Sequence, residues 1–286
     1  TMLGECWEEE ETFSVSDEKL AARIEQYENV PIGAVLLTAG VDVQDDRLEC
    51  LVKGWGLKDE SWFIDYRVFY GSPGRQQTWD MLDEFLKSNY QHETGVMLRI
   101  VTAAVDSGGH FTKTVYEFAK KRLNRRIFAV KGLGGYGKQF IGRASQNNRT
   151  RTLVIPLGVD TAKELIYDRL QIEEPGPGYM HFSEKCTEEY FLQLTSEKHV
   201  TRYNKGFPTK VWELKSGRRN EALDCEVYAL AAYTLLNANV ESIAEKLARQ
   251  AEMKKGALEK EAAPGPVKTR ARSFSGRKRI PWALRY

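Results

Sequence analysis

Three aspartates lie at the ends of predicted strands or in the first turn of a predicted helix, where a carboxylate can bind a metal ion. Asp42 lies near the end of the apolar stretch 35–43, Asp106 ends a second apolar stretch, and Asp224 lies in the first turn of an apolar helical segment. Mg²⁺ takes a few hard oxygen ligands from a protein and leaves its other positions to water and phosphate. Carboxylates from two strands and a helix therefore predict a site for Mg²⁺ or Mn²⁺.

Each aspartate also has a purely structural explanation. Asp42 could cap the turn after its strand, and Asp106 could cap the next helix. Asp224 resists this explanation, because Val227 and Tyr228 follow it at helical spacing and place it on the apolar face. An unpaired charge buried on that face would cost several kcal/mol, and a divalent cation is its natural partner.

Neighbouring residues extend this candidate site. Alternation along the strand puts Thr38, Gly40 and Asp42 on one face, and we expect Gly40 to leave room beside Asp42 for a metal or ligand. Four further acids are candidate outer ligands: Asp45, Asp46, Glu221 and Glu226.

Hydrophobic periodicity predicts the elements that position these acids. The first three strands form an antiparallel meander, and a helix, a strand, a second helix and a further strand follow. The predicted strands are 34–43, 47–55, 60–70, 97–106, 127–130 and 152–157, with a hairpin of 199–204 and 210–215; the predicted helices are 76–88, 109–123, 160–171, 186–196, 221–233 and 241–261.

This order of elements is the plan of the ribonuclease-H-like fold, an α/β class with a mixed sheet flanked by helices. In that plan the first strand lies beside the fourth and parallel to it, and the fourth connects to the fifth by a right-handed crossover. The ends of the first and fourth strands, where Asp42 and Asp106 fall, then meet at one edge of the sheet.

Composition narrows the functional classes. The 286 residues are 42% hydrophobic and 29% charged with a net charge of +2, which is typical of a soluble globular protein. Four dispersed cysteines and four histidines predict neither a zinc site nor a disulfide framework, and they favour a reducing cytoplasm. No apolar run approaches the roughly 18 residues of a membrane span.

Composition also divides the chain. We expect residues 1–30 to be an acidic linker ending in a short helix near 17–27, and residues 31–238 to form the folded domain. Residues 239–286 should be a charged helix and a flexible basic tail, since 264–286 carry seven Lys or Arg and no acid.

The stretch Gly132–Gln139 nearly matches a nucleotide-binding phosphate loop. Gln139 replaces the Ser or Thr whose hydroxyl would bind Mg²⁺, and Gly142 and Asn147 follow where a helix should begin. We therefore expect no ATP site; the stretch is either a plain connector or a basic loop that contacts a phosphate backbone.

Three separated motifs resemble the large terminase subunits of lambda-like tailed phages. They are residues 37–49 with 52–56, residues 105–109, and residues 219–224. In that family an ATPase motor precedes a ribonuclease-H-like nuclease that cuts concatemeric double-stranded DNA during genome packaging. The resemblance implies that Asp42, Asp106 and Asp224 are the metal-binding acids.

The resemblance also implies a setting in the host cell cytoplasm. Because the chain lacks an intact phosphate loop, it would be the nuclease part, with residues 1–30 left from the linker to the ATPase domain. Implied partners are double-stranded DNA, the small terminase subunit, and the portal of the procapsid, bound through the tail. Candidate DNA contacts are Lys131, Lys138, Arg143, Arg149, Arg202, Lys205 and Lys210.

The resulting hypothesis is a two-metal endonuclease. Asp42 would bridge two ions, of which Asp106 and Asp224 would each hold one, and the ions would activate water and stabilise the leaving 3′ oxygen. One alternative is another ribonuclease-H-like nuclease, such as a junction resolvase or an enzyme that cuts RNA–DNA hybrids. A second is a non-catalytic DNA- or portal-binding module, against which three retained acids argue, since negative charge repels phosphates.

Overall fold

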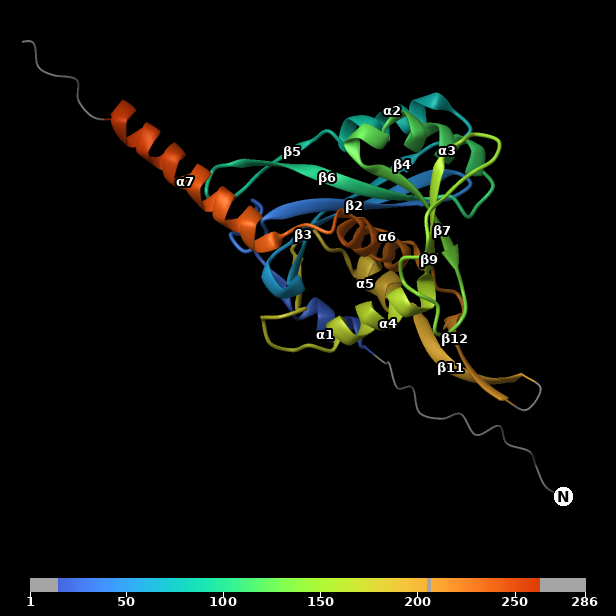
Figure 1. Ribbon diagram of the computed structural model, residues 1–286. Coiled ribbons are helices and arrows are strands. Elements are labelled where there is room, and N and C mark those ends of the chain that lie inside the picture. The colour runs from blue at the N-terminus through green and yellow to red at the C-terminus, as the bar shows by residue number, and fades with distance from the viewer. Residues whose placement is uncertain (1–14, 205–206, 263–286) are drawn as a thin grey trace, which may run out of the picture.

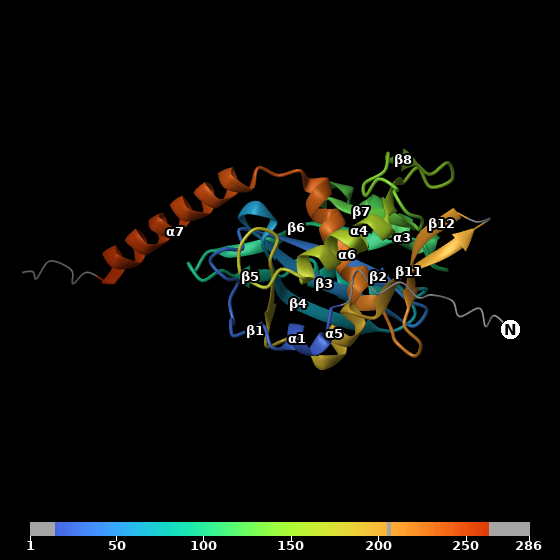
Figure 2. The same ribbon diagram turned by 90° about the horizontal axis from the view of Figure 1, so that it is seen from below.

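A mixed sheet runs through the centre of the protein, with helices on both faces (Figures 1 and 2). The computed structural model describes residues 15–204 and 207–262. The strands of this sheet follow the order β1-β10-β4-β3-β2-β6-β7-β9-β8, and β5 pairs with β6. A separate hairpin, β11 (Glu197–Asn204) with β12 (Phe207–Leu214), extends from the body.

The central strands confirm the predicted meander and crossover. β2 (Leu36–Val43), β3 (Arg47–Trp55) and β4 (Ser61–Tyr70) pair antiparallel in sequence order. β6 (Met97–Asp106) lies beside β2 and parallel to it, and β7 (Ile127–Leu133) lies parallel to β6. The order β4-β3-β2-β6-β7 is that of the ribonuclease-H-like fold.

Short strands extend the sheet at both edges. β9 (Leu153–Gly158) continues the parallel half beyond β7 and was predicted. The sequence analysis missed four strands of two to four residues: β1 (Ile24–Glu25), β5 (Asn89–Gln91), β8 (Ser145–Gln146) and β10 (Met180–Ser183). Strands this short carry too little alternation to be recognised, because it is their partners that define them.

Helices form one layer on each face of the sheet (Figure 1). One layer is α2 (Gln76–Phe85) and α3 (Thr112–Lys121), followed by the 3-10 turn Leu123–Arg125. The other layer contains α1 (Asp17–Ala21), α4 (Val159–Leu170), α5 (Glu188–Leu194) and α6 (Glu221–Leu236). α7 (Val240–Ala262) extends away from the body, although Val240 and Leu247 near its start are buried.

The residues before β2 pack against this body. The helix predicted near 17–27 ends earlier, at Ala21, because Ile24 and Glu25 pair instead with Phe182 and Ser183 of β10. Leu20 is fully buried. The division of the chain into linker, domain and tail stays a prediction, and the tail lies outside the described residues.

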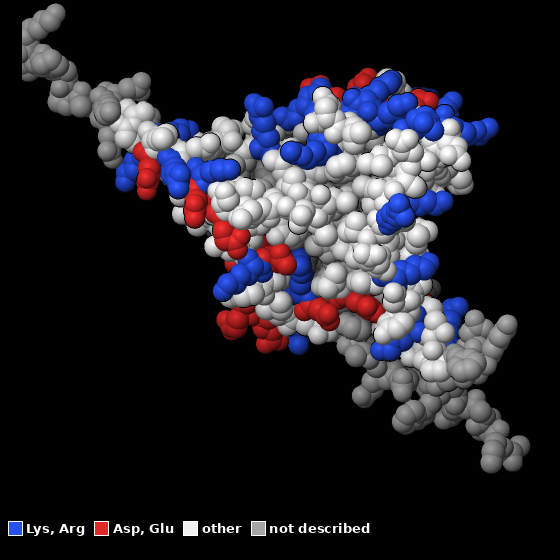
Figure 3. Space-filling model, viewed as in Figure 1, with Lys and Arg blue, Asp and Glu red and all other residues white. Residues whose placement is uncertain are grey.

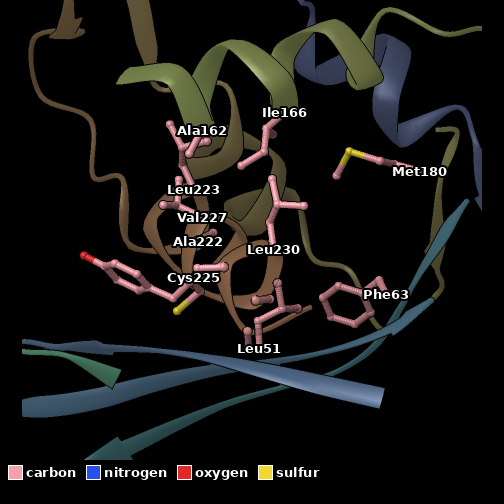
Figure 4. Packing of buried hydrophobic residues seen from close by; sticks show 14 of the residues in the cluster. Leu51, Phe63, Ala162, Ile166, Met180, Ala222, Leu223, Cys225, Val227 and Leu230 are labelled. Atoms are coloured by element: carbon pink, nitrogen blue, oxygen red, sulfur yellow. The ribbon is translucent and has the colours of Figure 1, made fainter. Parts of the chain in front are cut away.

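Helix α6 is buried on nearly every side. Figure 4 shows Leu223 and Val227 beneath Ala162 of α4 and Leu230 beneath Ile166, while Cys225 lies on the side of α6 that faces the sheet. A helix that is apolar all round needs cover on all sides, and here the sheet, α4 and α5 provide it.

The backbones of α6 and β2 touch at Gly40. A Cβ atom on Gly40 would lie 2.0 Å from the Cys225 carbonyl oxygen and 2.4 Å from the Ala229 nitrogen. Beside it, the Thr38 hydroxyl donates to the Ala229 carbonyl (3.0 Å) and accepts from the Trp55 indole (2.8 Å). The expectation that Gly40 leaves room for a ligand was wrong, because the helix backbone fills that space.

Gly40→Ala should therefore destabilise the protein by roughly 3 kcal/mol, since the added methyl group overlaps backbone atoms that cannot rotate away. The measurement is the urea midpoint of unfolding. Gly134→Ala is the matched control, because its Cβ would meet nothing nearer than an Asp160 oxygen at 3.7 Å. Equal midpoints for the two variants would show that α6 does not sit this close to β2.

Candidate functional site

Asp42 and Asp106 lie side by side at one edge of the sheet. The residues before them, Val41 and Val105, are register partners in the parallel β2–β6 pair. Both valines point into the core under α2 and α3, so alternation turns the two aspartates toward α6. Asp42 is 3% exposed and Asp106 is 9% exposed.

Asp224 reaches the same edge from the first turn of α6, which the contact at Gly40 holds against β2. Its side chain is 22% exposed, more than the side chains of the strand aspartates. One turn further along α6, the Tyr228 hydroxyl donates to Asp106. Asp224 thus lies on the same side of the sheet as the strand aspartates, and a shared metal site of the three acids stays a prediction.

Each carboxylate has a hydrogen-bond donor of its own. The Gln44 amide donates to Asp42, and the Gly108 backbone amide donates to Asp106 at 3.0 Å. The Asn220 amide nitrogen donates to Asp224 at 3.1 Å. These neutral donors orient the three acids without cancelling their charge.

Burial raises the pKa values of all three, and repulsion by neighbouring acids raises those of Asp42 and Asp224 further. Burial followed by the charge of Asp224 raises the pKa of Asp42 well above its usual range, although the bond from Gln44 opposes this. Burial also raises the pKa of Asp224, to about 7, against the opposing charge of Lys163. The pKa of Asp106 is raised mainly by burial. The negative charge of these three aspartates is thus only partly balanced by nearby cations.

Lys163 is the cation nearest to Asp224, and the sequence analysis missed it. Its ammonium lies 3.7 Å from Asp224 Oδ1 and 2.6 Å from Glu197 Oε1. Asn220 joins the group by donating to Glu197 at 2.8 Å. The sequence could have revealed it, because Lys163 lies three residues before Ile166 on the apolar face of α4. A lysine on such a face needs a buried acidic partner.

The four candidate outer ligands lie in other contacts. Glu221 is paired with Arg47 (2.6 Å) and Arg219 (3.1 Å). Glu226 is 1% exposed and paired with Lys53 and the Tyr190 hydroxyl. Because cations already compensate both glutamates, their positions do not support roles as outer ligands.

Asp45 and Asp46 occupy the exposed turn after β2. Asp45 meets His110 at 2.7 Å, and Asp46 meets Arg47 at 2.6 Å. Asp45 therefore lies close to the loop that follows Asp106, and a role for it beside a metal stays a prediction.

The candidate DNA contacts fall into two groups. Lys131, Lys138, Arg143 and Arg149 are exposed along the segment from β7 toward β9. On the hairpin, Lys210 is exposed, while Arg202 is exposed but paired with Glu213. Lys205 lies outside the described residues.

The glycine-rich stretch differs from a phosphate loop in its geometry. Gly132 and Leu133 belong to β7 and pair with β9, so Lys131 is inside the strand rather than just past it. Asp160 accepts a hydrogen bond from the Gly135 amide at 3.0 Å, which puts an acid where a phosphate would sit. The segment 134–152 contains the short strand β8 and no helix.

The chemistry of the acidic edge fits a hard divalent cation. Its donors are carboxylate and amide oxygens, and the carboxylates lack full compensation by cations. Among the described residues, no three acids, histidines or cysteines yet stand close enough to enclose one ion.

The strand order and the acids at the ends of β2 and β6 define a ribonuclease-H-like α/β domain with an acidic edge beside α6. The family model for the terminase large subunit gpA, endonuclease domain, matches residues 1–246. The chain belongs to this family, and the resemblance of its motifs is confirmed.

Curated relatives agree with this membership. The chain is 38% identical over 242 residues to the terminase large subunit of Escherichia phage lambda, and 34% identical over 241 residues to that of Enterobacteria phage P21. Each match covers 81% of this chain and 37% of the relative. The chain therefore spans little more than a third of the length of these relatives.

Two solved structures are distantly similar. The nuclease domain of the large terminase g2p of bacteriophage SPP1, with bound Mn, matches with a TM-score of 0.36 at 14% identity, covering 78% of this chain and 93% of that one. The HK97 bacteriophage large terminase matches with a TM-score of 0.35 at 11% identity, covering 76% of this chain and 42% of that one.

A search of the helices in the described residues found none with the length and apolar character of a membrane span.

Asp42→Asn should leave the melting temperature of the metal-free protein unchanged or a few degrees higher, because it removes one buried charge from a repelling set. A carboxyl group with a raised folded pKa destabilises the fold above that pKa, and protonation relieves the penalty as pH falls. The advantage of the variant should thus shrink below about pH 7, where Asp224 takes up a proton.

Thermal melts in EDTA at pH 8 and pH 6 measure both effects. Asp80→Asn, on the exposed side of α2, is the control and should melt as the wild type does at both pH values. A clear drop in the melting temperature of Asp42→Asn would mean that this carboxylate stabilises the fold.

Proposed function

We propose that this chain is a divalent-metal-dependent endonuclease that cuts concatemeric double-stranded phage DNA during genome packaging. One observation supports the proposal: Asp42 and Asp106 lie near the ends of neighbouring parallel strands, and Asp224 of α6 is near enough for its charge to raise the pKa of Asp42. Membership in a family of terminase endonuclease domains supports the same reaction.

The three aspartates are the proposed ligands of two Mg²⁺ or Mn²⁺ ions. Asp42 is suited to the shared position, because it is the most buried of the three and feels the charge of both others. Two such ions would supply a Lewis acid for the attacking water and another for the leaving 3′ oxygen of a phosphodiester.

The surrounding side chains would hold the carboxylates ready for the ions. Gln44 and Asn220 donate through neutral amides, which orient the acids and leave them negative. Lys163 partly offsets the charge of Asp224 while Glu197 engages its ammonium more closely. Lys163 is thus a positioning residue for Asp224, and it should limit repulsion when no ion is bound.

Substrate binding would use the basic residues beyond β7 and on the hairpin. Lys131 in β7 and Lys138 and Arg143 on the segment that follows it present exposed charges, and Lys210 does so on β12. Such contacts neutralise phosphates and position a duplex without reading its sequence.

The wider setting is proposed from the family. It comprises an ATPase domain of a longer chain, the small terminase subunit, a portal that binds residues 264–286, and the host cell cytoplasm. A junction resolvase would also fit the fold, but membership in the terminase family favours packaging. A non-catalytic module would gain from losing the three acids, and they are present.

Incubation of supercoiled plasmid with the chain and Mn²⁺ should yield nicked and linear DNA, and EDTA should stop the reaction. Asp106→Asn should reduce the rate at least 100-fold, because it removes one proposed ligand from the edge. Asp80→Asn should cut as the wild type does. Cleavage that persists in EDTA, or an Asp106→Asn variant of normal rate, would contradict the proposal.

A further inference from the structure

Positive charge is concentrated in one part of the chain. Residues 107–159 contain eleven Lys or Arg and one acid, Glu117, so this part carries +10 while the whole chain carries +2. These residues build α3, β7 and the segment that leads through β8 to β9. Figure 3 shows Lys and Arg over α2 and α3 and beside β7, whereas acids gather nearer to α4.

Within this part, a cleft of about 770 Å³ separates α3 from the turn at 147–150. Polar side chains and one aromatic ring line it: Thr112, Lys113, Tyr116, Glu117, Lys120, Asn147, Arg149 and Thr150. Three of these side chains are cations and one is an acid.

Hydrogen bonds fix the two walls of the cleft to each other. Lys120 on α3 donates to the Thr150 carbonyl at 2.7 Å, and Thr152 donates to the Tyr116 carbonyl at 3.3 Å. Asn147 shapes the opposite turn by accepting from the Arg149 and Thr150 amides at 3.0 and 3.1 Å. The cleft is therefore a formed feature of the fold.

The charges at its mouth are available to a ligand. The Lys113 side chain is 84% exposed and lies 3.9 Å from Glu117, a loose contact. Arg149 is exposed, and within the described residues no carboxylate pairs with it. Arg122 and Arg125, near the end of α3, are less available to a ligand, because both form ion pairs with Asp83 at 2.6 Å.

The cleft begins next to the acidic edge. Thr112 at its near end donates to the carbonyls of Ser107 (2.9 Å) and Gly109 (2.7 Å), in the loop that follows Asp106. A strand of DNA held at the acidic edge could therefore continue over this loop onto α3.

We propose that this cleft is a second DNA-backbone site, which binds phosphates of the duplex away from the bond that is cut. The proposal takes its ligand from the proposed function, but the surface lies outside the metal chemistry. Lysine, arginine, threonine and asparagine side chains are the common donors to DNA phosphates, and the single acid leaves the cleft positive. Lys113 and Arg149 would make the direct contacts, while Lys120 holds the walls together.

Duplex affinity of the full chain tests this proposal. Fluorescence anisotropy in EDTA over a range of KCl concentrations measures binding without cleavage. The double variant Lys113→Gln/Arg149→Gln should bind about tenfold or more weakly at 0.1 M salt, and the slope of log Kd against log salt should fall by about 2. The exposed pair on α7, Lys246→Gln/Arg249→Gln, should change neither.

Three results would overturn the proposal. The first is wild-type affinity and slope in the cleft variant, and the second is an equal loss in the α7 variant. The third is displacement of DNA by inorganic phosphate at constant ionic strength, which would indicate a site for a small phosphate compound. Both variants should keep the wild-type melting temperature, because the substituted side chains are exposed.

Plasmid cleavage separates this proposal from the proposed function. With Mn²⁺, the cleft variant should need more DNA to reach half its maximal rate but should keep that maximal rate. If the wild type bound duplex through the cleft yet never cut it, the proposed function would fail while the cleft proposal stood.

Discussion

The contact between the backbones of α6 and β2 is the constraint on which the rest of the site depends. Only glycine at position 40 lets the Cys225 carbonyl and the Ala229 amide approach the strand this closely. Asp224, one residue before Cys225, is thereby fixed beside the end of β2. Buried hydrogen bonds from Thr38 and Trp55 support the same contact, so packing in the core determines the position of the carboxylate that we propose as a metal ligand.

The same packing creates an electrostatic cost. Burial raises the pKa values of Asp42, Asp106 and Asp224, and the first and last also feel the charges of their neighbours. Lys163 offsets only part of this charge because Glu197 holds its ammonium at 2.6 Å. On the proposed function, bound cations would offset this cost, which is the usual balance between stability and function at such sites.

Much of this arrangement could be predicted from the sequence. Alternation located β2, β3 and β4 to within two residues, and two strands that each carry an aspartate at the end implied a shared edge. Periodicity says which face a residue occupies but not what covers that face. For this reason Gly40 was assigned to a ligand rather than to α6.

Contacts between distant segments could not be predicted in this way. Glu226 sits on α6 near Asp224 in sequence, yet its partner is Lys53, 173 residues away, on β3. The buried pair of Lys163 and Glu197 joins α4 to β11, which no local pattern connects. The near phosphate loop is a further example: Gly132 fits the local motif, but its pairing with β9 makes it part of a strand.

The central claim is that the acids of β2, β6 and α6 form one metal site, and a calorimetric titration with Mn²⁺ tests it most directly. The wild type should bind Mn²⁺ saturably, and Asp224→Asn should bind at least tenfold more weakly although it alters only the helix. Asp80→Asn should bind as the wild type does. If Asp224→Asn kept wild-type affinity and stoichiometry, α6 would not contribute to the metal site and the account would be wrong.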